Sequence, residues 1–472
     1  MSTRGALLAL GLVTFGRVAV AGPQATKDAA EPAGVTRRVM ELLQGFRFGT
    51  YGRIGYSSDL RQGSTGKPVN VVAHGPRLEE PPYVEIDLGY ELLREDAISF
   101  RGVFTLAFLE GFFHYDGDPD GGKVVVRNLY LEADHVLTSH LSLWAGSRMY
   151  RGDDIYLLDF WPLDNLNTLG GGARLTFGRT RLLLHAGVNR LNDRYQLQEV
   201  EVPSPRFGSD TVTVLDRQRL VTSVKGVREF PDAGLPFKVA LYGELHHLPS
   251  GVEWEDDDRQ HRRAVPADYG WVAGVQLGCW GFGDNSFVNL WARAAGGIAA
   301  YGEMGVPPLT AIDLDRRTTS SRDVVLALSG NYERGLLGLM LGGYTRYFRD
   351  GDGVSSDPDD GWEYVAVLRP HLFLHRFFHQ IFELSYQGRR PNGLDPVTET
   401  HLVPSVLKLS VMPAFSWDRG TYSRPQLRLL YTVSYLDAGA RLMFPEGDPR
   451  RGVAVRHFVG VQVEWWYNSS YR

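Results

Sequence analysis

Cysteine is almost absent from this sequence of 472 residues, which contains only Cys279. A single cysteine cannot form an internal disulfide, so the sequence excludes a small secreted fold held together by disulfides. We interpret Cys279 as a small apolar residue of a strand. Basic residues are not in excess either, because 50 Lys and Arg stand against 55 Asp and Glu, for a net charge of −5. We therefore expect no polybasic surface for nucleic acid.

Long hydrophobic runs are also missing. The apolar run from Ala6 to Phe15 is too short to span a bilayer, follows a basic residue and precedes Ala19-Val20-Ala21. This order predicts a signal peptide over residues 1–21, followed by a short N-terminal periplasmic segment over 22–45. Further along, no run approaches the ~20 residues of a membrane helix. If the chain lies in a membrane, it does so as a β-barrel.

Glycine and aromatic residues, in contrast, are plentiful. The chain has 54 glycines and 12% aromatic residues, and both are common in β-barrels. The mean hydropathy of −0.21 is that of a soluble protein. A barrel with a polar interior and long polar loops has the same value, because only every second strand residue meets lipid.

Strand candidates recur along the whole chain, with long polar connections and tight turns in alternation. Tight turns are expected at 94–96, 178–180 and 283–285, for example, and transmembrane barrels alternate short periplasmic turns with long outer loops. We therefore expect an all-β fold, a transmembrane antiparallel β-barrel of about eighteen strands over residues 46–472, in the bacterial outer membrane. The expected strands include 140–149, 171–178 and 210–228.

The alternation of side chains in the last strand predicts its two faces. One parity is mostly apolar and ends in aromatic residues, as a lipid face requires: Val455, His457, Val459, Val461, Val463, Trp465 and Tyr467. The other parity lines water: Arg456, Phe458, Gly460, Gln462, Glu464 and Trp466. The inner parity elsewhere adds Tyr51, Arg53, Tyr83, Glu85 and Tyr422. Aromatic and charged residues therefore recur on the side of the strands that faces water.

The stretch from 150 to 170 interrupts the alternation. It is rich in aspartate and aromatic residues but too apolar, at 155–158 and 160–163, for a freely solvated loop. A long loop of this kind needs a surface to lie against, and a barrel lumen provides one. We expect it to fold inward and to bring Asp154, Asp159, Trp161 and Asp164 into the lumen.

These residue types suit a sugar. Sugar rings present apolar faces that pack on aromatic side chains, and edges of hydroxyl groups that bond to charged or amide side chains. A conducting site needs each contact to be modest, so that the solute can leave.

Several motifs resemble the maltoporin family of outer-membrane sugar porins. They are Tyr-Gly-Arg-x-Gly at 51–55, Tyr-x-Glu at 83–85, Trp-Ala-Gly-x-Arg-x-Tyr at 144–150, Tyr-Ser-Arg-Pro at 422–425 and Gly-Val-Gln-Val-Glu-Trp-Trp at 460–466. The resemblance implies a trimeric barrel of eighteen strands whose third loop folds inward as a constriction. It also implies facilitated diffusion of maltose or maltooligosaccharide-like sugars.

The resemblance assigns roles by matching position. The family has a row of aromatic side chains along the pore, called the aromatic slide, and the positions that match it are Tyr51, Tyr83, Tyr422 and Trp466. Phe287 is a weaker match to an inner residue of the slide. Tyr115 is a weaker match to an aromatic residue that a neighbouring subunit contributes. Trp161 takes the place of the constriction tyrosine. The flanking polar track comprises Arg53, Arg77, Glu85, Asp154 and Asp159.

Two departures affect this assignment. The family's constriction arginine is Gly152 here, with Arg151 beside it, so either Arg151 swings into the pore or the polar track is weakened. Asp164 is a further candidate of the polar track on the same loop. Pro162 and Leu163 replace bulky aromatics, so the width of the pore, and with it the sugar that passes, can differ.

Other functions stay open at this point. The chain could be a general-diffusion or anion-selective porin, although an anion pore favours rings of Arg and Lys rather than this mixture of charges. It could carry two carboxylates for glycoside hydrolysis, but no second catalytic element is visible. It could also bind a sugar without conducting it. We expect no cofactor. The acidic runs 116–121 and 350–353 match only the first half of a calcium loop, so we interpret them as solvated outer loops rather than metal sites, with a loosely bound divalent ion as the open alternative.

Overall fold

The computed structural model describes residues 45–61, 68–95, 98–109, 123–255 and 261–469. The predicted signal peptide, residues 22–44 of the predicted periplasmic segment and Tyr115 lie outside the described residues.

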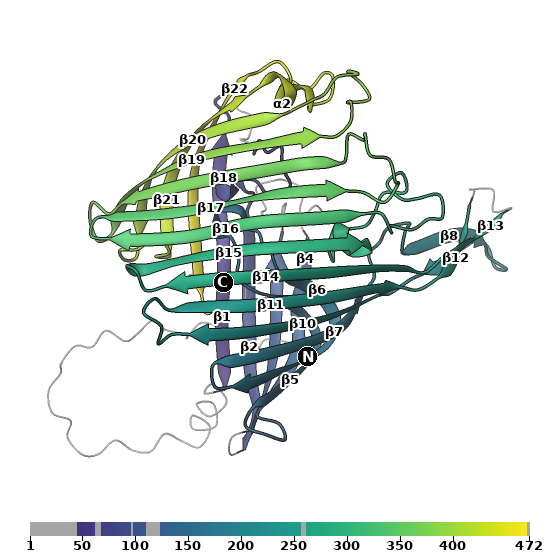
Figure 1. The fold of residues 1–472 in the computed structure, drawn as a ribbon, viewed down its shortest axis with the longest axis horizontal. Helices are drawn as coiled ribbons and strands as arrows, with labels where there is room; N and C mark the ends of the chain where they lie inside the picture. Colours follow the sequence, from purple (N-terminus) through teal and green to yellow (C-terminus); the bar gives the residue numbers. More distant parts are fainter. Residues whose placement is uncertain (1–44, 62–67, 96–97, 110–122, 256–260, 470–472) are drawn as a thin grey trace, which may run out of the picture. The chain divides into compact units, whose positions relative to one another are not determined.

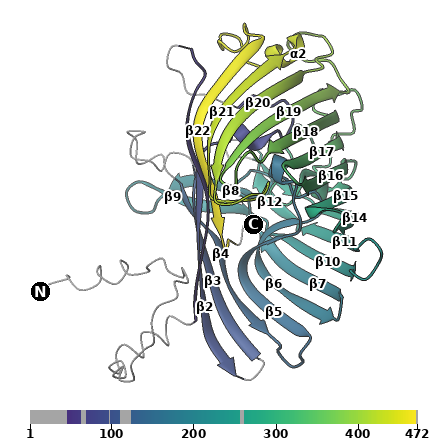
Figure 2. The same ribbon diagram turned by 90° about the vertical axis from the view of Figure 1, so that its left-hand side faces the viewer.

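The described chain forms one sheet of 18 strands, drawn in Figure 1. Each strand pairs antiparallel with its neighbour along the chain, and β22 pairs with β1, where Tyr51 lies opposite Trp466. This last pairing closes the sheet into a barrel (Figure 2). The expected all-β barrel is therefore confirmed. Its strands are β1 (Phe46–Ser58), β2 (Tyr83–Glu95), β3 (Ile98–Phe108), β4 (Val124–Asp134), β5 (Leu141–Arg151), β6 (Asn165–Phe177), β7 (Thr180–Asn189), β10 (Arg219–Phe230), β11 (Phe237–Leu248), β14 (Asp268–Trp280), β15 (Asp284–Gly297), β16 (Arg322–Arg334), β17 (Leu337–Arg349), β18 (Gly361–Leu372), β19 (Phe378–Pro391), β20 (Ser405–Ser416), β21 (Gln426–Leu436) and β22 (Val455–Tyr467).

The connections alternate between tight turns and long loops, as expected. Two long loops carry small sheets of their own, β8 (Leu197–Pro203) with β9 (Ser209–Asp216), and β12 (Gly251–Trp254) with β13 (Arg262–Val265). The predicted strand 210–228 is wrong as one element, because β9 ends and β10 begins within it. A short helix, α2 (Ala438–Leu442), follows β21, and the Asp437 side chain accepts a hydrogen bond from the Ala440 N–H at its start. Among the described residues, no helix has the length and hydropathy to cross a bilayer.

Burial in β22 follows the predicted faces. Val461 and Tyr467 are 47% and 60% exposed, whereas Gln462 and Glu464 on the other parity are 8% and 0% exposed. The outward residues form the lipid face, and the inward ones line the lumen.

The segment between β5 and β6, which we call the constriction loop (152–164), folds into the lumen as expected. Ile155, the 3₁₀ turn Tyr156–Leu158, Phe160 and Leu163 are buried against inward side chains of β11 and β14–β18. The loop is shorter than the predicted 150–170, because β5 continues to Arg151 and β6 starts at Asn165.

A second segment also folds inward, which the sequence did not predict. This segment, the inner segment (68–82), ends in the 3₁₀ turn Arg77–Glu79. Leu78 packs on inward residues of β19–β22. The backbone N–H of Val71 donates to the Gln387 side chain at 2.9 Å, and the Lys408 ammonium bonds to Glu79. The inner segment thus covers the β17–β22 side of the lumen and leaves the opposite side open.

Candidate solute-binding site in the lumen

Most of the predicted slide aromatics form a continuous row of rings. The ring centroids of Tyr83 and Tyr51 are 5.9 Å apart, and Trp466 packs against this pair. The row continues through Tyr156, 5.9 Å from Trp466 and 5.5 Å from Tyr422. It ends at Phe287, 6.1 Å from Tyr422. Strands far apart in sequence bring most of these rings together, while Tyr422 comes from the turn between β20 and β21 and Tyr156 from the constriction loop.

The rings differ in the surface that they offer. Tyr51 is 0% exposed and Tyr83 is 7% exposed, whereas Trp466, Tyr422 and Phe287 are half-buried. The last three present ring surface to the lumen, while Tyr51 lies behind other side chains.

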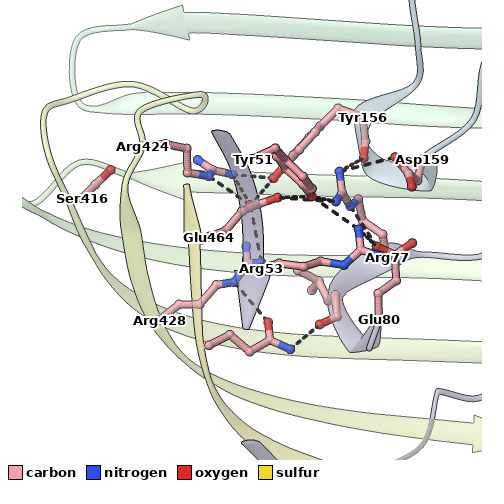
Figure 3. Close-up of polar contacts among 12 residues, drawn as sticks. Tyr51, Arg53, Arg77, Glu80, Tyr156, Asp159, Ser416, Arg424, Arg428 and Glu464 are labelled. Atoms are coloured by element: carbon pink, nitrogen blue, oxygen red, sulfur yellow. Dashed lines mark hydrogen bonds and ion pairs between the residues drawn. The ribbon is translucent and has the colours of Figure 1, made fainter. Parts of the chain in front are cut away.

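A buried polar cluster around Glu464 holds the row in place (Figure 3). The Tyr156 hydroxyl donates to Glu464 Oε2 at 2.6 Å, and the Arg424 Nε donates to the same oxygen at 3.0 Å. Arg428 and Arg77 each lie 3.5 Å from this carboxylate. Arg77 also donates to the Tyr51 hydroxyl. Because a buried carboxylate is stable only with such partners, Glu464 ties the constriction loop, the inner segment and the barrel wall together.

A second group of charged residues surrounds Tyr83, at one end of the row. Arg53 lies 2.7 Å from Glu80, and its guanidinium is 5.5 Å from the centre of the Tyr83 ring. The Tyr83 hydroxyl donates to Glu85, which also lies 3.4 Å from Arg127. Burial raises the pKa of Glu80 on the inner segment, against the lowering effect of Arg77 and Arg53.

The Arg151 side chain packs on Trp161. It thus lies in the lumen near the position where the family has its constriction arginine and this chain has Gly152. Its guanidinium lies 4.1 Å from the centre of the Trp161 ring, and its Nε donates to Asn165 at 2.6 Å. A Cβ at Gly152 would lie 2.1 Å from an Asp164 oxygen and 2.5 Å from the Lys225 ammonium, so a side chain there would displace this ion pair.

The three predicted aspartates of the constriction loop do not converge. Asp164 is ion-paired with Lys225 at 2.7 Å, and burial raises the pKa of Asp164 against the opposite effect of that ammonium. Asp159 adopts a left-handed backbone with φ of 50° and lies 3.9 Å from Arg77. Asp154 is half-buried on the same loop.

Two cavities lie in the lumen, and the first is also lined by Ala73 and His74 of the inner segment. The outer cavity, of about 560 Å³, lies between the constriction loop and the long loop after β15, and its lining includes Arg53, Tyr83, Asp159, Trp161 and Glu303. The turn-side cavity, of about 530 Å³, lies between the constriction loop and the tight turns. Arg151 lines both cavities, so its side chain lies between them. Phe287 and Tyr422 line a separate, more open hollow beside the turn between β14 and β15.

Glu303 adds a titratable group to the outer cavity. It lies in the loop after β15, where Asn189 Nδ2 donates to its Oε1 at 2.8 Å. Burial raises the pKa of Glu303 to about 7, although the hydrogen bond from Asn189 acts in the opposite direction. The charge of the outer cavity therefore changes near neutral pH.

Sequence reasoning missed Tyr156, Arg127 and Arg428 and named Arg424 only inside a motif. Arg127 and Arg428 lie on strands, where their inward parity could have indicated them. Tyr156 lies in a loop and Arg424 in a turn, so no alternation predicts their direction.

Three carboxylates of the loop after β17 do lie close together. Oxygens of Asp350, Asp352 and Asp357 are all within 4.8 Å of one another. The sequence run 350–353 thus belongs to an acidic group of the outer loops, away from the residues of the ring row.

Comparison with known proteins agrees with this architecture. A sequence model of the LamB porin family matches residues 46–467. Maltoporin from Vibrio cholerae serotype O1 is 22% identical over 364 residues, which cover 74% of this chain and 78% of that protein. Maltoporin from Hahella chejuensis is 22% identical over 398 residues, which cover 82% and 83%. The solved structure of OmpT of Vibrio cholerae in its trimer form is 10% identical, with a TM-score of 0.43, and the match covers 90% of this chain and 100% of that one. Since the family model spans nearly all of the barrel, this chain belongs to the LamB porin family and is an outer-membrane channel.

Proposed function

We propose that this porin conducts sugars of the maltooligosaccharide type by facilitated diffusion. The observation that carries the proposal is the continuous row of rings from Tyr83 to Phe287. Each ring can pack on the apolar face of a sugar unit, and successive rings let a chain of units advance without losing all contacts at once.

The individual roles follow from exposure. Trp466, Tyr422 and Phe287 offer ring surface, and Trp161 and Tyr83 line the outer cavity where a solute enters. Arg53, Arg151 and Asp159 also line that cavity and provide partners for sugar hydroxyls. In this proposal Tyr51, Arg77 and Glu85, which are almost fully buried, position their neighbours rather than touch the solute.

The remaining assignments are part of the same proposal. The mature protein acts as a homotrimer in the outer-membrane bilayer, after loss of the signal peptide 1–21, with residues 22–45 as a periplasmic segment. Tyr115 stays a prediction for an aromatic shared between subunits. The solute crosses unchanged, without a cofactor and without chemistry.

Single-channel recording in a planar bilayer tests the proposal. Maltooligosaccharides are titrated against the open-channel current, with sucrose and phosphate as controls. We expect saturable block by the maltooligosaccharides. A current that no sugar blocks would instead indicate a general-diffusion porin, and block by phosphate alone would indicate an anion porin.

A further inference from the structure

A second group of aromatic rings lines the turn-side cavity, away from the predicted slide. Trp144 and Tyr150 of β5 stack with ring centroids 5.7 Å apart and an interplanar angle of 28°. Tyr130 of β4 meets Trp144 edge-on at 6.2 Å. His185 of β7 stacks against Trp144 at 5.7 Å and against Tyr150 at 6.0 Å. Tyr130 and Tyr150 are half-buried and line the cavity, so they offer ring surface to a solute.

Arg148 lies in the middle of these rings. Its guanidinium is 4.5 Å from the ring centre of Tyr130, 5.2 Å from that of Tyr150 and 5.3 Å from that of Trp144. Its ion pair with Glu132 has a length of 3.6 Å, longer than a hydrogen bond, and it donates no hydrogen bond to any described residue. The side chain is 18% exposed and lines the cavity. The rings therefore fix the guanidinium while its donors remain available.

The charge of the cavity has the same sign as Arg148. Among its lining residues six are basic and three are acidic. The basic ones are Arg148, Arg151, Arg174, Arg181, Lys225 and Lys238, and the acidic ones are Glu132, Asp153 and Asp164. Lys225 pairs with Asp164 at 2.7 Å, and Lys238 pairs with Asp153 at 2.6 Å. Arg174 pairs with Asp134 at 2.9 Å and Arg181 with Glu229 at 2.6 Å, so the excess positive charge lies with Arg148 and Arg151. A neutral sugar has no need of this excess.

We propose that the turn-side cavity binds a sugar ring that carries an anionic group, a carboxylate as in a hexuronate or a phosphate ester. The ring packs on Tyr130 and Tyr150, and the anion accepts two parallel hydrogen bonds from Arg148, the geometry that a guanidinium offers to a carboxylate or phosphate. Arg151 lies between this cavity and the outer cavity, so in this proposal a solute enters the turn-side cavity by passing the Arg151 side chain. This inference rests on the proposed function and specifies its solute.

The test compares three solutes that differ only at C6. Glucose, glucuronate and glucose 6-phosphate are titrated against the single-channel current of the full-length protein in 0.1 M KCl, where screening is moderate. We expect an anionic sugar to block at a concentration about tenfold lower than glucose, since a charge-assisted hydrogen bond contributes that much. Whichever anion blocks more tightly identifies the anionic group.

Two variants distinguish specific binding at Arg148 from a general electrostatic attraction to the positively charged cavity. Arg148→Gln is expected to bring the anionic sugars to within about threefold of glucose. Arg181→Gln removes the same charge from the same cavity, but Arg181 is held by Glu229 at 2.6 Å, so this variant is expected to keep most of the preference. If Arg148→Gln does not fold, as judged by heat-modifiable gel mobility, Arg148→Lys keeps the charge, lacks the planar fork and is expected to lose most of the preference.

Two results would overturn the inference. One is equal block of the wild type by all three solutes, and the other is an equal loss of preference in the variants of Arg148 and Arg181. Maltotriose, titrated in parallel, tests the proposed function separately. If maltotriose blocks and the acidic sugars show no preference, only the further inference fails, whereas a channel that no sugar blocks refutes the proposed function.

Discussion

The two tryptophans near the end of β22 point to opposite faces of the barrel wall. Trp466 faces the lumen, with the Arg424 guanidinium 4.5 Å from its ring centre. Trp465 has the outward parity, and its Nε1 donates to Thr50 Oγ1 at 3.2 Å. We expect Trp466→Ala to weaken block by maltooligosaccharides about fivefold, because a ring contact contributes about 1 kcal/mol, and to leave the open-channel current nearly intact. Trp465→Ala is the matched control and should leave block unchanged, whereas equal block in both variants would refute the role of Trp466 in the slide.

The titration of Glu303 leads us to expect that the ion selectivity of the channel depends on pH. Its pKa is raised to about 7, so the carboxyl is mostly neutral at pH 6 and mostly ionised at pH 8. A rise in pH therefore adds negative charge to the outer cavity, and we expect the reversal potential in a KCl gradient to shift toward cation preference. The same ionisation lowers the folding stability as pH rises above the ordinary value of a glutamate, because the folded state favours the protonated form.

The variant Glu303→Gln should remove part of this shift. Asp350 in an outer loop also has a pKa raised to about 7 by burial, so the difference between wild type and variant is the quantity to measure. Glu399→Gln alters an exposed outer carboxylate and serves as control. Identical shifts in wild type and Glu303→Gln would show that Glu303 does not titrate there.

The strand-borne residues of the site could be predicted, and the loop-borne ones only in part. Parity placed Tyr51, Arg53, Tyr83 and Trp466 on the inner wall because a strand fixes the direction of each side chain. Tyr156 escaped prediction because the direction of a loop residue depends on packing against remote strands. For the same reason the sequence did not show that Tyr51 would be covered.

At the scale of elements, the inner segment determines how much of the lumen is open. The His74 N–H donates to the Tyr344 hydroxyl of β17 at 3.1 Å, and Gln462 Nε2 of β22 donates to the Leu78 carbonyl at 2.8 Å. We expect replacement of residues 69–76 by Gly-Ser to raise the single-channel conductance about twofold, because pore width limits the current.

A deletion in another long loop serves as the control for the inner-segment variant. Removal of residues 204–208, the tip of the β8–β9 hairpin, shortens a long loop without touching the inner segment. It should leave the conductance unchanged. Equal conductance in the wild type and the 69–76 variant would mean that the inner segment does not restrict the current.

The sequence predicted the barrel strands well and the inward segments unevenly. Alternating polarity and the rhythm of turns and loops identify strands that have lipid on one side and water on the other. The constriction loop was predicted because its apolar residues are concentrated. In the inner segment Asn70 interrupts the apolar stretch 69–73, and His-Gly-Pro-Arg at 74–77 separates this stretch from Leu78, so no period indicates their burial. The sequence did not predict β8, β12 and β13, which are only 7, 4 and 4 residues long, and it merged β9 with β10.

At the scale of the whole molecule, the residues that line the two cavities include more basic than acidic side chains. The outer cavity has five arginines in its lining, Arg53, Arg127, Arg151, Arg293 and Arg346, against Asp159, Glu244 and Glu303. The turn-side cavity has six basic and three acidic residues, and Arg151 is common to both, which gives ten basic against six acidic residues in total.

This excess predicts a weak preference for anions at pH 6. The reversal potential in a KCl gradient should indicate anion preference at 0.1 M salt and a smaller one at 1 M, because the screening length falls from about 10 Å to about 3 Å. The preference should stay weak, since acidic residues are interspersed with the arginines. Cation preference at both concentrations would contradict the charge distribution.

The pairing between β1 and β22, which we call the seam, determines when the barrel can close. Tyr51 and Glu464, in contact across the seam, are separated by 413 positions along the chain. Every other pair of neighbouring strands is joined by a nearby turn or loop, so those pairings can form as soon as their residues have been synthesised. The first strand, however, must keep one edge unpaired until the last strand arrives. A polypeptide that stops before β22 is therefore an open sheet rather than a narrower pore, and we expect the cell to depend on protection of that edge throughout translocation.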